Sequence, residues 1–147
     1  MSSITQSPTL TSLDTAIFIA QAAKEKQAGD VLILEIGHLT SIADYFVFGS
    51  GESERQVRAI ASFIEKEVSA RFHCTPQVEG KETSQWILLD FDEVIVHIFK
   101  SEVRQYYALE KMWADAPQIA IPEPGTKFRQ PVRSPQGLPL PKMARRS

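Results

Sequence analysis

The sequence predicts an α/β (α+β) domain, in which a single mixed β-sheet is flanked by helices. Runs of branched and aromatic residues at 30–36, 45–48 and 86–100 predict strands. Amphipathic stretches that begin at residues 12 and 53 predict helices. Because helices and strands alternate along the chain, the favoured arrangement packs the helices against one sheet.

Length and composition agree with one soluble domain. The chain has 147 residues, of which 43% are hydrophobic and 23% charged, enough for a single core. We expect no membrane partner, because there is no apolar run of about 18 residues, and residues 1–10 lack the features of a secretory signal. The single cysteine, Cys74, excludes an internal disulfide and a multi-cysteine metal site. We therefore expect a cytosolic protein, or one from an organelle matrix.

The first elements follow from capping residues and hydrophobic spacing. Residues 1–10 are polar and are expected to be disordered. Ser12 is a predicted cap for a helix that runs to Gln27, where Gly29 suits the exit. The branched run at 30–36 then predicts a buried strand.

The middle of the chain predicts a second strand, a helix and a short edge strand. The strand at 45–48 ends in Gly-Ser-Gly at 49–51, which we interpret as a turn into the next helix. Ser53 and Gln56 form a capping-box pattern for that helix. An extended piece at 75–80 is a candidate edge strand.

Residues 86–100 predict a hairpin that is apolar on both faces. On its first strand Ile87 and Leu89 point one way, whereas Trp86 and Leu88 point the other way. Such a strand is covered on both sides, or covered on one side and bound to a partner on the other. Trp and Tyr are enriched at binding hot spots, so Trp86, Leu88 and Tyr45 form a candidate partner site. Core packing beneath a helix is the alternative.

The last predicted helix begins at Ser101 and stops at Ala116 before a proline. Residues 117–147 contain seven of the nine prolines and no hydrophobic periodicity, so we expect a disordered tail. The predicted organisation is therefore a disordered start at 1–10, a domain at 11–116 and a tail at 117–147.

Two sequence patterns suggest that the protein could be an enzyme. A glycine turn before a helix suits an anion, yet residues 49–51 match no complete phosphate-binding motif, and backbone geometry explains the glycines equally well. Ser50 with Asp90 and Asp92 has the residue types of a metal-dependent nucleotidyltransferase, because two carboxylates on one strand face can share Mg²⁺. A whole helix separates the two features in sequence, which disfavours this reading.

The remaining candidate ligands have ordinary structural explanations. His38, His73 and His97 show no metal-ligand spacing with one another or with Cys74. His97 falls within a strand, where we expect a packed, hydrogen-bonded side chain rather than a catalytic base. Cys74 follows a helix and is interpreted as a small, partly buried side chain.

Three segments together resemble the ribosomal silencing factor family, also called the Iojap-like proteins. They are LTSIADYFVFGSGESERQVRAIA at 39–61, VEG at 78–80 and WILLDFDEVIVHIFKSEVRQYYALEKMW at 86–113. Their order and spacing match, as does the preceding strand DVLILEI. The resemblance covers about residues 10–116 and leaves the tail outside.

The resemblance implies a fold distantly similar to nucleotidyltransferases but without their catalytic arrangement, and hence no enzyme, cofactor or metal. It implies binding to the large ribosomal subunit through ribosomal protein number fourteen, at the face where the small subunit docks. Such binding blocks subunit joining and represses translation when nutrients run short. Plastid and mitochondrial relatives are associated with organelle ribosomes and their assembly, so a role in large-subunit assembly is the alternative.

The family also implies contact residues by position in its motifs: Trp86, Leu88, Asp90, Tyr107, Glu110, Lys111, Asp44 and Tyr45. Asp44 and Tyr45 match the family motif, but their side chains have an alternative role in the fold. A homodimer of the free protein is a further option, since pairing would hide the two-sided apolar hairpin.

Charge is distributed unevenly between the predicted domain and its tail. Residues 117–147 hold six basic side chains and one acidic side chain, a formal charge of +5, which leaves −7 for residues 1–116. An acidic domain favours a basic protein partner, whereas the basic tail is suited to contact with ribosomal RNA.

Overall fold

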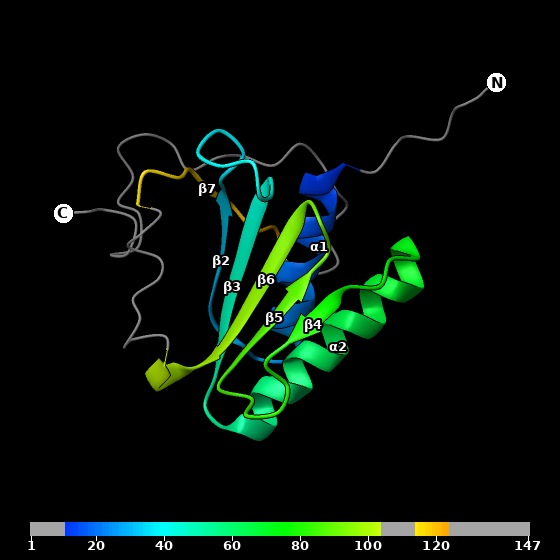
Figure 1. Cartoon of the computed structure of the whole chain (residues 1–147), viewed down its shortest axis with the longest axis vertical. Coiled ribbons are helices and arrows are strands. Elements are labelled where there is room, and N and C mark those ends of the chain that lie inside the picture. Colours follow the sequence, from blue (N-terminus) through cyan, green and yellow to red (C-terminus); the bar gives the residue numbers. More distant parts are fainter. Residues whose placement is uncertain (1–10, 104–113, 124–147) are drawn as a thin grey trace.

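Two α-helices and six strands make up the part of the chain that the computed structural model describes, residues 11–103 and 114–123 (Figure 1). The elements are α1 (Ser12–Glu25), β2 (Gly29–Glu35), β3 (Tyr45–Gly51), α2 (Glu54–Phe72), β4 (Gln77–Glu79), β5 (Trp86–Asp90), β6 (Val94–Lys100) and β7 (Gln118–Ile119). The strands form one sheet in the order β4-β5-β6-β3-β2-β7. Every pairing is antiparallel except the parallel pair β3–β6. The predicted fold class, a single mixed sheet with flanking helices, is confirmed.

Helix α1 is capped one residue earlier than predicted. The Thr11 hydroxyl accepts a hydrogen bond from the Asp14 backbone N–H, and the Asp14 carboxylate accepts one from the Thr11 N–H, which completes a capping box. Ser12 is instead the first helical residue, and its hydroxyl donates to Asp44 Oδ2 at 3.0 Å. The helix ends at Glu25, because Gln27 takes a left-handed backbone conformation with φ 63°.

Helix α2 follows its predicted stripe. Ser53 caps it by accepting from the Gln56 N–H at 3.1 Å, while the Gln56 side chain accepts from the Glu52 N–H rather than from Ser53. The side chains buried along the helix are Val57, Ile60, Ala61, Ile64 and Val68. The chain turns away at His73, which has φ 56°.

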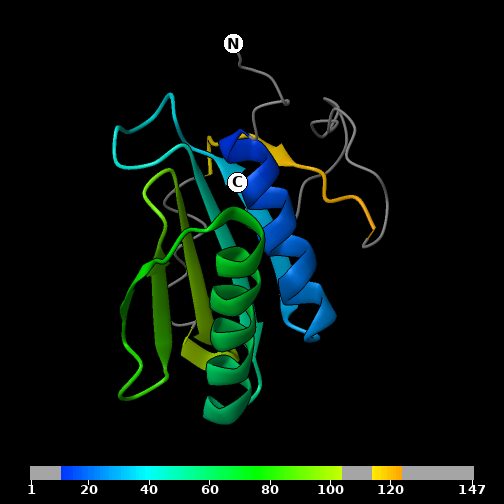
Figure 2. The same cartoon turned by 90° about the vertical axis from the view of Figure 1, so that its right-hand side faces the viewer.

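Both helices lie on the same face of the sheet, as Figure 2 shows, and we call this the helix face. Alternate strand residues point into the core beneath them because side chains on a strand alternate between faces. These core strand residues are Ile33, Val47, Ile87, Leu89, Val94, Val96 and Ile98. Their burial fixes the register of the sheet, since a one-residue slip would expose them.

The Gly-Ser-Gly segment at 49–51 is strand, so the predicted turn is wrong. All three residues belong to β3 and are buried. A Cβ atom on Gly51 would lie 3.0 Å from Val57 Cγ2 and 3.1 Å from the Val57 backbone nitrogen. The glycine therefore permits α2 to start close against the sheet. The Ser50 hydroxyl donates to the Gly29 carbonyl at 3.2 Å, a structural contact and no phosphate cradle.

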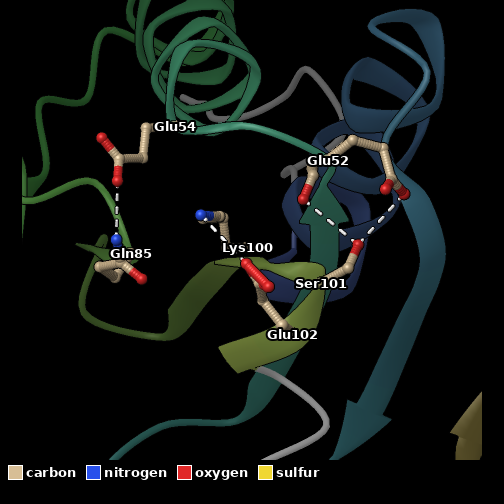
Figure 3. Close-up of polar contacts among 7 residues, drawn as sticks. Glu52, Glu54, Gln85, Lys100, Ser101 and Glu102 are labelled. Atoms are coloured by element: carbon tan, nitrogen blue, oxygen red, sulfur yellow. Dashed lines mark hydrogen bonds and ion pairs between the residues drawn. The ribbon is translucent and has the colours of Figure 1, made fainter.

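Polar contacts hold the C-terminal ends of β3 and β6 to the start of α2 (Figure 3). The Ser101 hydroxyl lies 3.2 Å from both the Gly51 carbonyl oxygen and Glu52 Oε2. The Gln85 side chain donates to Glu54 Oε2 at 2.8 Å, and Lys100 pairs with Glu102 at 3.1 Å. Residues 101–103 are helical, in agreement with the predicted start of the last helix.

The sheet extends past the predicted domain end at Ala116. Gln118 and Ile119 pair with Leu34 and Ile33, and the Pro117 carbonyl accepts from the Glu35 N–H at 2.8 Å. These contacts correct the start of the predicted tail, because residues 117–123 pack with the domain. Predictions for residues 1–10, for most of the last helix and for the rest of the tail fall outside the described residues. No helix within the described ranges is long and apolar enough to cross a membrane.

Candidate partner-binding face of the sheet

A second core covers the sheet on the side away from α1 and α2, which we call the open face. Its strand residues alternate with those of the helix face: Leu32 and Leu34 on β2, Phe46 and Phe48 on β3, Ile95, His97 and Phe99 on β6, and Trp86 on β5. The aromatic members touch one another at ring-centroid distances between 4.8 and 6.2 Å. These rings form a packed aromatic core in which Phe48, His97 and Phe99 are buried, so only partly exposed neighbours such as Trp86 on β5 can meet a partner.

Strand β5 presents the three predicted contact residues side by side on this face. Trp86, Leu88 and Asp90 are half-buried, whereas Ile87 and Leu89 between them are fully buried on the helix face. The predicted alternation is thus confirmed. Leu88 belongs to neither core and pairs with His97 on β6 and with Glu79 on β4. The strand consequently offers an aromatic, an aliphatic and an acidic group at alternate positions, and we call Trp86, Leu88 and Asp90 the strip of β5.

Trp86 has its polar atom satisfied inside the protein. Its indole N–H donates to His97 Nδ1 at 3.2 Å, and its ring stacks on Phe99 with centroids 5.0 Å apart. Both contacts hold the ring in one orientation. Because the N–H is already bonded, the half-exposed indole presents apolar surface that a partner can cover without supplying an acceptor.

His97 is the packed, hydrogen-bonded histidine that the sequence indicates. Burial lowers the pKa of His97 from 6.5 to about 4, so the ring is neutral at physiological pH. Its Nδ1 accepts from Trp86, which places the ring proton on Nε2. Nε2 is buried without a hydrogen-bond partner, and the ring stacks on Phe48 at 5.1 Å. Its packing, rather than acid–base chemistry, defines its role.

Asp90 stabilises the hairpin turn that follows β5. Its Oδ1 accepts from the Asp92 backbone N–H at 2.8 Å, and Asp92 has the left-handed φ of 78°. The Phe91 N–H donates to the Val94 carbonyl at 2.9 Å across the same turn. Asp90 therefore stabilises the turn in addition to lying at the end of the strip.

Asp44 and Tyr45 are not part of this strip. Tyr45 packs against the core of the helix face, and the Asp44 carboxylate accepts from Ser12 at the start of α1. The backbone N–H groups of both residues donate to the Glu93 carbonyl, at 2.8 and 3.1 Å. The structure thus gives them the alternative role in the fold, joining β3 to the hairpin turn. Tyr107, Glu110 and Lys111 lie outside the described residues.

The nucleotidyltransferase arrangement is not formed. Ser50 pairs with Phe99 and Asp90 with Ile95, four residues apart on β6, which separates them by about 13 Å along the strand direction alone. Among the described residues no group of three acidic, histidine or cysteine side chains is placed to hold a metal ion. Ser50 and Asp90 are therefore too far apart to share one metal-bound phosphate.

The sequence did not predict the hydrogen bond between Trp86 and His97 or the cluster of aromatic residues beside it. The available signal was spacing, since Phe46 and Phe48 are two residues apart, as are His97 and Phe99, and residues two apart share a strand face. Placing the two pairs side by side required the parallel pairing of β3 with β6.

Comparison with known proteins gives one family. The family described as "Ribosomal silencing factor during starvation" matches residues 9–138, beyond the end at 116 that the sequence indicated. Ribosomal silencing factor RsfS of Bacillus subtilis is 39% identical over 98 residues, covering 67% of this chain and 83% of the relative. A mouse relative, "Mitochondrial assembly of ribosomal large subunit protein 1", is 30% identical over 93 residues, covering 61% of this chain and 41% of the relative.

A solved structure has the same fold. A crystal structure from Bacillus halodurans superposes with a TM-score of 0.61 at 34% identity, covering 74% of this chain and 96% of that chain. The mixed sheet and its helices are thus shared with that protein.

Proposed function

Because this chain belongs to the ribosomal silencing factor family, we propose that it is a translation repressor without enzymatic activity. In this proposal it binds the large ribosomal subunit through the subunit's protein number fourteen. Bound there, it occupies part of the surface on which the small subunit docks and so blocks subunit joining, above all when nutrients are limited. The observation that carries the binding site is the alternation of half-buried Trp86, Leu88 and Asp90 on β5.

The character of the open face supports a basic protein partner. Trp86 and Leu88 supply apolar area, of the kind that dominates binding energy at interfaces. Asp90 ends the strip, and Glu79 lies beside Leu88 on the edge strand β4. Carboxylates around an apolar patch favour a cationic protein surface and repel bare phosphate. Tyr107, Glu110 and Lys111 are proposed as further contacts, with Asp44 and Tyr45 secondary because both serve the fold.

A steric repressor needs no catalytic step. If the protein binds free large subunits and cannot bind joined ribosomes, it withdraws large subunits from the joining equilibrium by mass action. At a concentration 100 times its Kd this linkage opposes joining by about 2.7 kcal/mol, roughly a hundredfold. Repression therefore follows from affinity and concentration alone.

The decisive experiment is a subunit-joining assay with purified ribosomal subunits, read by sedimentation. Wild-type protein should reduce the fraction of joined ribosomes, whereas Trp86→Ala should not. Glu65→Ala, on helix α2 at the other face of the sheet, is the matched control and should repress like the wild type. The proposal would be refuted if saturating wild-type protein left the fraction of joined ribosomes unchanged.

A role in large-subunit assembly is the second candidate, favoured by the name of the mouse relative. The same surface would then act on maturing particles. Depletion of the protein should cause precursor particles to accumulate, while joining of mature subunits stays normal. Loss of repression without precursor particles would exclude this candidate.

Three further parts of the proposal concern the surroundings of the site. We place the protein in the cytoplasm, or in an organelle matrix, as for the mitochondrial relative.

We propose that the basic tail contacts ribosomal RNA, so that charge-reversing substitutions there should weaken the salt dependence of ribosome binding. A homodimer that covers the open face in the free state would appear in sedimentation equilibrium and should dissociate when the partner protein is added.

A further inference from the structure

Two large aliphatic side chains stand out on the surface beyond the strands of the sheet. Leu39 is 47% exposed and Ile42 is 57% exposed, and they are the exposed large hydrophobics of the described chain. Both lie on the segment between β2 and β3, which projects beyond the end of the sheet in Figure 2. The function proposed for β5 makes no use of them.

Acidic side chains surround these two residues. Asp44 follows the segment, and its backbone N–H donates to Glu93 in the hairpin turn, which also contains Asp92. Glu35 ends β2 at the same place and pairs with His38 at 3.6 Å. No lysine or arginine occurs at residues 27–54 or 82–99. This acidic end, defined by Leu39, Ile42 and the exposed residues Asp44, Asp92 and Glu93, therefore fits an occupant that is both apolar and cationic.

The chain's own C-terminal segment has that chemistry. Residues 124–147 contain six basic and no acidic side chains. Within them residues 138–146, LPLPKMARR, place Leu138, Leu140 and Met143 beside Lys142, Arg145 and Arg146. Proline restricts φ in any chain, so a segment with two prolines has less conformational entropy to lose on docking.

The tail starts within reach of the acidic end. Residue 122 is held on α1, because the Gln21 side chain donates to the Pro122 carbonyl at 2.9 Å. The acidic end adjoins the start of the same helix through the bond from Ser12 to Asp44. Gln21 and Ser12 are nine residues apart, about 14 Å along a helix. A chain of about 15 residues reaches up to roughly 50 Å when extended, so the length of chain before residue 138 is enough to cover this distance.

We propose that residues 138–146 dock in cis on the acidic end, with their leucines on Leu39 and Ile42 and their cations against the surrounding carboxylates. A linker of this length gives an effective concentration of the order of millimolar. Even a weak contact is then substantially populated. Docking shields the two exposed aliphatics in the free protein. This contact is proposed for the free protein, whereas the RNA contact proposed above for the tail is made on the ribosome; the family match ends at residue 138.

The test uses two full-length variants with equal changes in charge. Lys142→Glu/Arg145→Glu/Arg146→Glu reverses the docking segment, and Lys127→Glu/Arg129→Glu/Arg133→Glu reverses the nearer part of the tail. Backbone and methyl NMR signals of Leu39 and Ile42 report the contact. In the first variant they should move to the positions that the wild type adopts at about 0.5 M salt, where exposed charges are screened. In the second variant they should stay at the low-salt positions.

Several outcomes would overturn the inference. Signals of Leu39 and Ile42 that are identical in wild type and both variants would show that the segment does not dock. Equal displacement by both variants would show unspecific charge attraction. Displacement that grows with protein concentration would assign the contact to a second copy. Variants that change only the binding of an RNA oligonucleotide would make the segment an RNA contact alone.

Discussion

Lowering the pH should destabilise this protein through one buried histidine, His97. Its pKa is lowered from 6.5 to about 4 by burial in the folded state, while an unfolded histidine titrates near 6.5. Between these values the unfolded chain binds a proton that the folded chain does not bind. Stability therefore rises with pH across this window, is fully present above about 6.5, and is lost as the pH falls toward 4.

The size of the effect follows from the two pKa values. Each unit of difference is worth about 1.4 kcal/mol, so His97 costs the fold about 3 kcal/mol by pH 4 and about 2 kcal/mol at pH 5. Protonation also turns Nδ1 into a donor, which breaks the hydrogen bond from Trp86. The open face and the stability of the fold are thus linked to the same proton.

Urea unfolding between pH 4.5 and 7.5 measures this contribution. His97→Gln keeps an acceptor for Trp86 and removes the titrating ring, so its unfolding free energy should fall by about 2 kcal/mol less than the wild type between pH 7.5 and 5. The two proteins are compared by how steeply their unfolding free energies change with pH. The absolute values differ, because Gln also loses the stacking on Phe48 and lowers stability at every pH. His38→Gln, at an exposed site, should follow the wild type. Parallel curves for wild type and His97→Gln would refute the reasoning.

Three other perturbations test the site and the fold. Trp86→Ala should weaken binding to the large subunit by at least ~2 kcal/mol, about 30-fold in Kd, while its unfolding curve stays cooperative. Gly80→Ala should lower stability by roughly 1–3 kcal/mol and displace Trp86, because Gly80 has φ 91° and a Cβ there would collide with the Trp86 carbonyl oxygen. Gly29→Ala is the control and should change little, because its Cβ would meet only two Ser50 oxygens at 3.9 Å, an ordinary contact distance. Thr11→Ala should cost about 1 kcal/mol in unfolding free energy through loss of the α1 cap.

The features that sequence predicted correctly are those set by local spacing. The stripe of α2 follows from the spacing of three and four from Val57 to Val68, and burial confirms it. The alternation of Ile87 and Leu89 with Trp86 and Leu88 follows in the same way from the two-residue period of a strand. Both signals lie within a single element, so no tertiary information was needed.

The features that sequence missed depend on what lies across the fold. Gly51 resembles a turn residue locally, but it is a strand residue whose missing side chain admits Val57 of α2. Tyr45 begins a run that is apolar at every position, so the sequence does not indicate which face it points to; pairing places it on the helix face. β7 is two residues long within a proline-rich stretch, and only its contact with β2 reveals it.

The parallel pairing of β3 with β6 determines when a growing chain can acquire its binding strip. Tyr45 and Val94 are neighbours in the sheet although they lie 49 positions apart in sequence. Closing a loop of that length costs about 3.4 kcal/mol in chain entropy before any contact offsets it. β5 lies against β6, so the strip is complete only once both have been synthesised. A nascent chain that ends before residue 100 consequently lacks the completed β5–β6 pair that carries the proposed binding residues.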